Sequence, residues 1–135
     1  MEKKRVLFLC THNSARSQMA EGLLRALKGD LYEGYSAGIS PTAVDPDAVR
    51  AMVEIGIDIS RQRSKDLDEV PSIKFDLTVT VCDGAKEACP FFPGAKEQIH
   101  NSFDDPEACE GETRFRAFRR VRDEIGEWIK ETFQD

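Results

Sequence analysis

The sequence has few cysteines, only two histidines and no excess of positive charge. Four cysteines occur in 135 residues, and no two of them form a C-x-x-C pair. Four scattered cysteines are too few for a secreted disulfide scaffold, and the missing pairs argue against a structural zinc site. The formal net charge of −6 gives no electrostatic reason to bind nucleic acid or an anionic membrane.

Long apolar runs are also missing, and so are repeats, low-complexity tracts and linkers. The start "MEKKRVLFLC" resembles a signal peptide, but its apolar run is too short and no small-residue cleavage site follows. No segment approaches the length of a membrane span. We therefore expect one domain over residues 1–135, a cytoplasmic location and reduced cysteines.

Strand-like and helix-like apolar patterns alternate along the chain. Strands are expected at 5–10, 31–38, 75–82 and 96–103, and helices at 17–28, 46–56 and 112–133. Asp45 is the expected N-cap of the second helix, with Pro46 in its first position. Strands separated by helices predict right-handed βαβ units, and hence an α/β fold with a parallel sheet.

Helical spacing also predicts which side chains face the core. The expected core residues of the first two helices are Met19, Ala20, Leu23, Leu24, Leu27, Val49, Met52 and Val53. The last helix carries five arginines that are expected to form a solvated face: Arg114, Arg116, Arg119, Arg120 and Arg122.

Chemically reactive residues follow three of the expected strands. Cys10 ends the first strand, Cys82 ends the third, and Asp104 and Asp105 follow the fourth. Because ligands of parallel sheets bind beyond the carboxyl ends of the strands, we expect two cysteines and a carboxylate at one edge.

The stretch "CTHNSARS" after the first strand has the features of an anion-binding loop. Backbone N–H groups at a helix start bind anions and also stabilise a cysteine thiolate. Arg16 can bind a tetrahedral oxyanion with two hydrogen bonds, Ser17 can donate to the sulfur, and Asn13 tolerates a left-handed turn. A buried cysteine packed for structure alone is the alternative, but this combination of neighbours favours a nucleophile.

At this level of detail the chain resembles the low-molecular-weight protein tyrosine phosphatase superfamily, and more closely its thioredoxin-coupled arsenate reductases. The resemblance rests on "CTHNSARSQMAEG", "SAG", "GIDIS", "DLTVTVC", "CP", "FDDP" and "RVRDEIGEWIK". It implies a single domain with a four-stranded parallel sheet flanked by helices, in agreement with the periodicity.

The resemblance also implies roles for individual residues. Cys10 would be the nucleophile, Arg16 the oxyanion clamp and Asp105 the general acid, although an aspartate before a proline is otherwise a common turn residue. The oxyanion-binding loop would consist of Thr11, His12, Asn13, Ser14, Ala15 and Arg16.

A reductase needs two electrons, which thiols supply by forming a disulfide. By the resemblance, Cys82 attacks Cys10 and releases arsenite through a transient Cys10–Cys82 disulfide. Cys89 then attacks Cys82, and thioredoxin reduces the Cys82–Cys89 disulfide. The alternative for this pair is two packed thiols. Cys109 is expected to be an exposed bystander.

The sequence departs from the family at three positions. Ala15 replaces a cysteine that often lies inside the loop, and Glu107 stands where tyrosine phosphatases usually place an aromatic ring. Some related reductases bind potassium behind the loop with residues that match Asn13, Glu21 and Ser36, plus an aspartate. Lys65 stands in the place of that aspartate. Since its ammonium can occupy the cation's position, we expect no potassium requirement and no tightly bound cofactor.

Three functions remain open from the sequence. Reduction of arsenate, with thioredoxin as the partner, is favoured. A phosphatase acting on phosphotyrosine or small phosphate esters is the alternative, and a non-catalytic phosphate-binding or redox-sensing module is the third.

Overall fold

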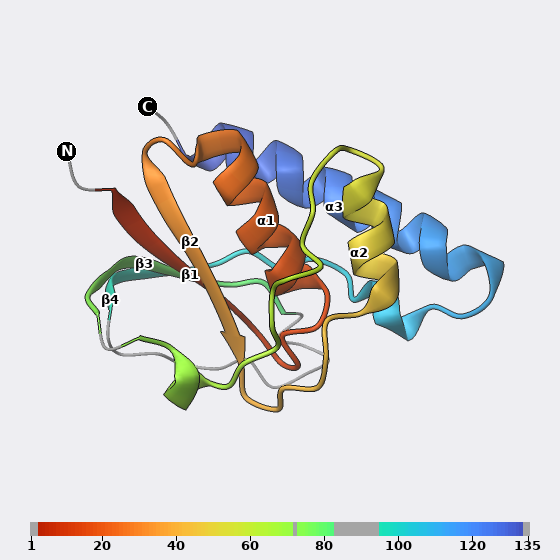
Figure 1. The fold of residues 1–135 in the computed structure, drawn as a ribbon, viewed down its shortest axis with the longest axis horizontal. Coiled ribbons are helices and arrows are strands. Elements are labelled where there is room, and N and C mark those ends of the chain that lie inside the picture. Colours follow the sequence, from red (N-terminus) through yellow and green to blue (C-terminus); the bar gives the residue numbers. More distant parts are fainter. Residues whose placement is uncertain (1–2, 72, 83–94, 134–135) are drawn as a thin grey trace.

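The computed structural model describes residues 3–71, 73–82 and 95–133, and it contains one four-stranded sheet (Figure 1). The strands are β1 (Lys4–Cys10), β2 (Tyr32–Gly38), β3 (Phe75–Thr80) and β4 (Ala95–His100). Their order is β2-β1-β3-β4, and every neighbouring pair is parallel. The predicted α/β class and the four-stranded parallel sheet are therefore confirmed.

In the described residues, two helices and a short 3-10 turn lie between strands, and a second 3-10 turn and the last helix follow the fourth strand. They are α1 (Arg16–Lys28), α2 (Pro46–Val53), η1 (Leu67–Glu69), η2 (Pro106–Ala108) and α3 (Glu112–Thr132). As predicted, Asp45 caps α2, because its side chain accepts a hydrogen bond of 2.8 Å from the Asp47 amide. After α2, the left-handed Gly56 (φ 79°) reverses the chain.

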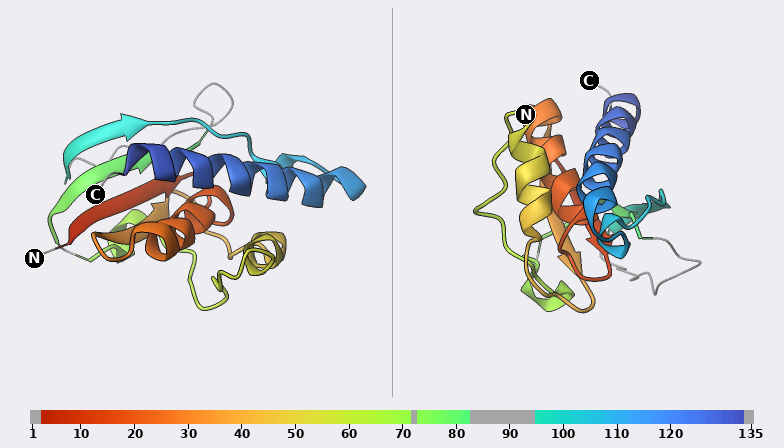
Figure 2. Two further views of the ribbon diagram at one scale, coloured as in Figure 1. Left: turned by 90° about the horizontal axis from the view of Figure 1, so that it is seen from above. Right: turned by 90° about the vertical axis from the view of Figure 1, so that its right-hand side faces the viewer.

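The three helices lie on one side of the sheet (Figure 2), and alternation along β1 divides the core into two parts. Val6, Phe8 and Cys10 face the three helices, whereas Leu7 and Leu9 face a smaller cluster with η1 and its neighbours. Each fully buried side chain of this size stabilises the fold by about 1.5–3 kcal/mol. The central strand β1 is therefore buried on both faces, which fixes its register and the position of Cys10 at its end.

The burial predictions for three residues are wrong: two expected core residues are exposed, and one expected surface residue is buried. Leu27 and Val53 are 39% and 58% exposed, because each lies at the margin of the helix face that contacts the core. Arg122 was expected in solvent but is buried, donating to the Ala51 carbonyl oxygen (2.8 Å) and to Glu54 (2.9 Å). Arg119 also pairs with Glu54, so these arginines join α3 to α2.

Candidate active site

The loop between β1 and α1 is folded into the protein beside β2. Asn13, Ser14 and Ala15 are buried, whereas Thr11 is half-buried and His12 is exposed, with its Nδ1 atom 3.0 Å from the Ser40 carbonyl oxygen. This contact agrees with the interpretation of His12 as a loop residue.

Gly38 at the end of β2 lets the loop come this close. A Cβ atom at this position would lie 2.7 Å from the Thr11 carbonyl oxygen and 2.9 Å from the Asn13 nitrogen. Because both contacts are to backbone, only glycine fits. In the sequence, Gly38 was recognised only as part of a motif.

A chain of hydrogen bonds ends at the sulfur of Cys10. The Asn13 side-chain amide donates to Ser17 Oγ at 2.8 Å, and Ser17 Oγ lies 2.8 Å from Cys10 Sγ. An ionised sulfur can only accept, so with Cys10 in the thiolate form the Ser17 hydroxyl is the donor of this contact. The cysteine at the end of this chain is only 2% exposed.

The orientation of Asn13 is fixed by donors around its oxygen. Its Oδ1 atom accepts from the Lys65 backbone amide (2.9 Å) and from Gln18 Nε2 (2.9 Å). A backbone N–H can only donate, so the Asn13 nitrogen must point toward Ser17. Asn13 also has the left-handed backbone conformation (φ 49°) predicted for it. Sequence reasoning missed the supporting role of Gln18, for which it contained no signal.

Arg16 lies at the start of α1, where no side chain of the described residues caps the helix. It is 4% exposed, and its Nη1 atom donates to the Phe103 carbonyl oxygen at 3.3 Å. Its Nη2 atom is 3.8 Å from Asp105 Oδ2. The neighbouring Asp104 is instead 66% exposed and pairs with Arg120. Of the two aspartates, Asp105 is therefore the one that faces the loop.

Glu107 also reaches the loop, which the sequence did not predict. The Ser14 hydroxyl donates to Glu107 Oε1, and the Glu107 backbone amide donates to Asp105 Oδ1 at 3.0 Å. Burial raises the pKa of Glu107 from 4.5 to about 7; the Ser14 hydrogen bond opposes this shift, and Asp45 and Asp105 add to it. The only sequence signal was the position of Glu107 directly after Asp-Pro.

The cysteines differ in their states. Cys10 and Cys109 are free thiols, and Cys82 is disulfide-bonded. Cys82 is fully buried in the same cluster as Cys10, where the Val81 amide donates to the Leu9 carbonyl oxygen at 2.9 Å. The ends of β1 and β3 thus bring Cys10 and Cys82 to one edge. Cys89 lies outside the described residues.

The region behind the loop contains the residues considered for potassium. Ser36 donates to Glu21 at 2.6 Å, and burial raises the pKa of Glu21 although Ser36 and Lys65 oppose the shift. Lys65 Nζ donates to the Arg63 carbonyl oxygen at 2.6 Å, and burial lowers its pKa although Glu21 opposes this. Among the described residues, no three His, Cys, Asp or Glu side chains gather as metal ligands. The expected independence from potassium remains a prediction.

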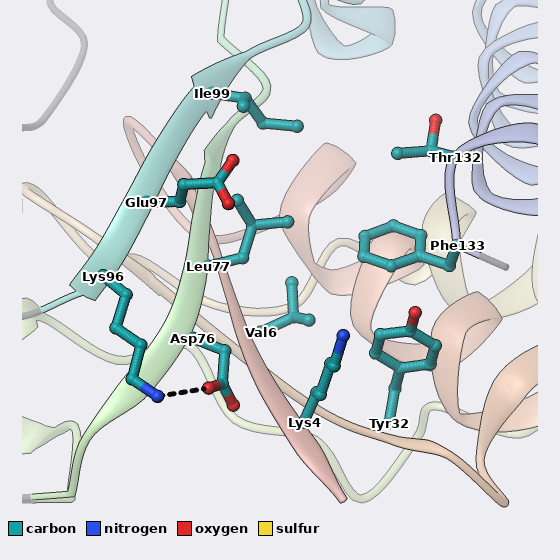
Figure 3. Close-up of a pocket in the computed structure, with 10 residues that line it drawn as sticks. All are labelled: Lys4, Val6, Tyr32, Asp76, Leu77, Lys96, Glu97, Ile99, Thr132 and Phe133. Carbon is teal, nitrogen blue, oxygen red and sulfur yellow. Dashed lines mark ion pairs between the residues drawn. The ribbon is translucent and has the colours of Figure 1, made fainter. Parts of the chain in front are cut away.

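A separate cavity of about 480 Å³ lies at the amino ends of the strands, opposite to the loop (Figure 3). An ion pair of 3.4 Å between Lys96 and Asp76 crosses part of its wall. Its lining residues are Lys4, Val6, Tyr32, Asp76, Leu77, Lys96, Glu97, Ile99, Thr132 and Phe133. Among the described residues, this cavity contains none that the sequence predicted for the site.

The helices were also compared with the length and apolarity that a membrane span requires. None of the helices in the described ranges is long and apolar enough to span a bilayer.

The family model, the curated relatives and the solved structures that resemble this chain agree with one another. The low molecular weight phosphotyrosine protein phosphatase family matches residues 5–135. A curated arsenate reductase of Halalkalibacterium halodurans is 53% identical over 132 residues, which cover 96% of this chain and 95% of that protein. A solved arsenate reductase in the phosphate-binding state has a TM-score of 0.79 at 29% identity, with 95% of both chains covered. A thioredoxin-dependent arsenate reductase of Corynebacterium glutamicum has a TM-score of 0.67 at 26% identity, covering 96% of this chain and 61% of that one.

Proposed function

Since the chain belongs to the low molecular weight phosphotyrosine protein phosphatase family, we propose that it reduces arsenate to arsenite, starting from an adduct on Cys10. The curated relative at 53% identity is an arsenate reductase, which supports this choice of substrate. The loop at the end of β1 suits a small tetrahedral oxyanion, because no side chain in the described part of the chain caps the start of α1 and Arg16 supplies a guanidinium group there.

In the first step, the Cys10 thiolate attacks arsenic and one arsenate oxygen leaves as water. Ser17 donates to the thiolate before attack, because its hydroxyl oxygen lies 2.8 Å from the sulfur and an ionised sulfur can only accept. Arg16 neutralises the charge of the oxyanion, and Asp105, 3.8 Å from Arg16, supplies a proton to the leaving oxygen. The product is a Cys10 thioester of arsenate.

In the second step, the Cys82 thiolate attacks the sulfur of Cys10. The electron pair of the sulfur–arsenic bond stays on arsenic, which leaves as arsenite, and a Cys10–Cys82 disulfide forms. The Cys89 thiolate then attacks Cys82 and frees the Cys10 thiolate. Thioredoxin returns two electrons and two protons to the Cys82–Cys89 disulfide.

The disulfide at Cys82 is the observation that carries this proposal beyond phosphate chemistry. A phosphatase has no use for a cysteine at the end of β3, whereas a reductase needs one that can be oxidised while Cys10 is a free thiol. The thioredoxin-dependent relative from Corynebacterium glutamicum supports the choice of electron donor. Lys65 would supply the positive charge behind the loop in place of potassium.

A coupled assay tests the proposal. NADPH consumption is followed with thioredoxin, thioredoxin reductase and arsenate, beside a parallel measurement of aryl phosphate hydrolysis. We expect arsenate-dependent consumption that is abolished in Cys10→Ser and unaffected by replacing sodium with potassium salts. Aryl phosphate hydrolysis without any arsenate-dependent consumption would favour the phosphatase.

A slow phosphatase activity is the second candidate, because the first step needs only Cys10, Arg16, Ser17 and Asp105. Phosphate is also a tetrahedral oxyanion. In its second step water would attack the phosphorus of the Cys10 adduct, and the Cys10 thiolate would leave. A protein inactive in both assays that still binds phosphate would instead be a binding module.

A further inference from the structure

Glu107 joins two parts of the site that are far apart in sequence. Its carboxyl group accepts a hydrogen bond from Ser14 in the buried loop, and its backbone amide binds the Asp105 side chain. Both contacts originate in η2, a turn of only three residues. Displacing Glu107 would therefore move Asp105 as well.

Two further side chains hold Glu107 from the other side. Arg114 of α3 donates to the Glu107 carbonyl oxygen at 3.1 Å and forms an ion pair with Asp45. The Asp45 backbone amide in turn donates to the Ser14 carbonyl oxygen at 2.9 Å. The loop, the start of α2, η2 and the start of α3 therefore meet around Glu107, whose carboxyl group binds Ser14 and whose backbone carbonyl binds Arg114.

We propose that Glu107 is a positioning residue that fastens η2 to the loop through Ser14, and so holds Asp105 beside Arg16 for proton transfer. The inference rests on the proposed function, because it assigns Glu107 a part in the first chemical step. The loop itself does not depend on Glu107, since Asn13 and Gln18 anchor it from behind. Loss of Glu107 should thus impair proton transfer more than oxyanion binding.

The protonation of Glu107 should control this contact. The neutral carboxyl group can accept from Ser14 and donate its own proton to Asp45, whose hydrogen bond contributes to the raised pKa of about 7. The ionised form would place a negative charge against Asp45 and Asp105, with Arg114 and Arg16 as the cations around the cluster. The contact should therefore weaken as pH rises through 7.

Single-turnover rates of arsenite release test the inference. Glu107→Ala should lower the rate about 10- to 100-fold through misplacement of the acid. Its affinity for inorganic phosphate, measured as protection of Cys10 from iodoacetamide, should change less than about threefold, because the loop remains anchored. Glu107→Gln keeps a neutral group of the same shape, so it should match the wild type at pH 6 and exceed it above pH 8. Glu110→Ala, an exposed neighbour, is the matched control and should behave as wild type.

The outcomes separate this inference from the proposed function. The inference is overturned if Glu107→Ala keeps the wild-type rate, or if its rate and its phosphate affinity fall equally. It is also overturned if the ratio of the Glu107→Gln rate to the wild-type rate does not change with pH. If the wild type converts neither arsenate nor an aryl phosphate, the proposed function is wrong. The ¹³C titration of the Glu107 carboxyl carbon, which needs no turnover, then decides whether Glu107 is held in place. Its midpoint should be near 7 and fall in Asp45→Asn, and a midpoint near 4.5 in the wild type would overturn the inference.

Discussion

Replacing Ser17 with alanine removes the hydroxyl group between Cys10 and Asn13. In the wild type, Ser17 Oγ lies 2.8 Å from both Cys10 Sγ and Asn13 Nδ2. The substitution therefore has two consequences: the thiolate loses its donor, and a fully buried amide group of Asn13 loses its acceptor.

The two consequences have separate magnitudes. A hydrogen bond to a charged group contributes about 1.5–3 kcal/mol, so alkylation of Cys10 should slow about 10- to 100-fold. An unsatisfied buried amide costs about 1–3 kcal/mol of folding free energy, which should lower Tm by roughly 3–10 °C. We therefore expect Ser17→Ala to be both less reactive and less stable than the wild type.

Alkylation of Cys10 by iodoacetamide at pH 7, followed by mass spectrometry, measures the first effect, and thermal unfolding measures the second. Ser14→Ala is the control for reactivity, because its hydroxyl group donates to Glu107 rather than to the sulfur. An alkylation rate in Ser17→Ala within about twofold of wild type would refute the assignment of Ser17 as the thiolate donor, whatever the change in Tm.

The remaining predictions concern the acid, the electron relay and stability. Asp105→Asn should slow formation of the Cys10 adduct about 100-fold in rapid-quench experiments, and Asp104→Asn should not; the reverse order would identify Asp104 as the acid. Cys82→Ser should retain any aryl phosphate hydrolysis but lose thioredoxin-coupled arsenate turnover, and a parallel loss of both would indicate a structural role. Because the pKa of Glu107 rises from 4.5 to about 7 on folding, its contribution to stability is present below pH 4.5 and decreases as pH rises through 7. In urea unfolding, the free energy of unfolding of the wild type should therefore decrease by about 1–2 kcal/mol between these pH values, and that of Glu107→Gln should not. This range is reduced for solvent screening, because the group is partly exposed. An equal pH dependence in both proteins would contradict the raised pKa.

The local features of this protein were predictable because they depend on neighbouring residues. The strand that ends at Cys10 and the helix that follows the loop are set by apolar periodicity. Asp45 before Pro46 is a local signal for a helix start, and the left-handed turn at Asn13 follows from its side chain. Parallel connections then brought Cys10, Cys82 and Asp105 to one edge, as the alternation of strands and helices predicted.

Only the tertiary structure decided which polar side chains meet. Helical spacing from Phe118 and Ile125 puts Arg122 on the apolar face of α3, but only the packing of α3 against α2 shows that Glu54 pairs with it. Likewise, the spacing between Ser14 and Glu107 carries no periodic signal, since 93 residues separate them. Hydrogen bonds and ion pairs of this kind depend on how whole elements pack, because a difference of a few ångströms in packing makes or breaks them. The strand that ends at Cys10 and the loop that follows it are thus encoded locally, whereas the contact between Ser14 and Glu107 exists only in the folded chain.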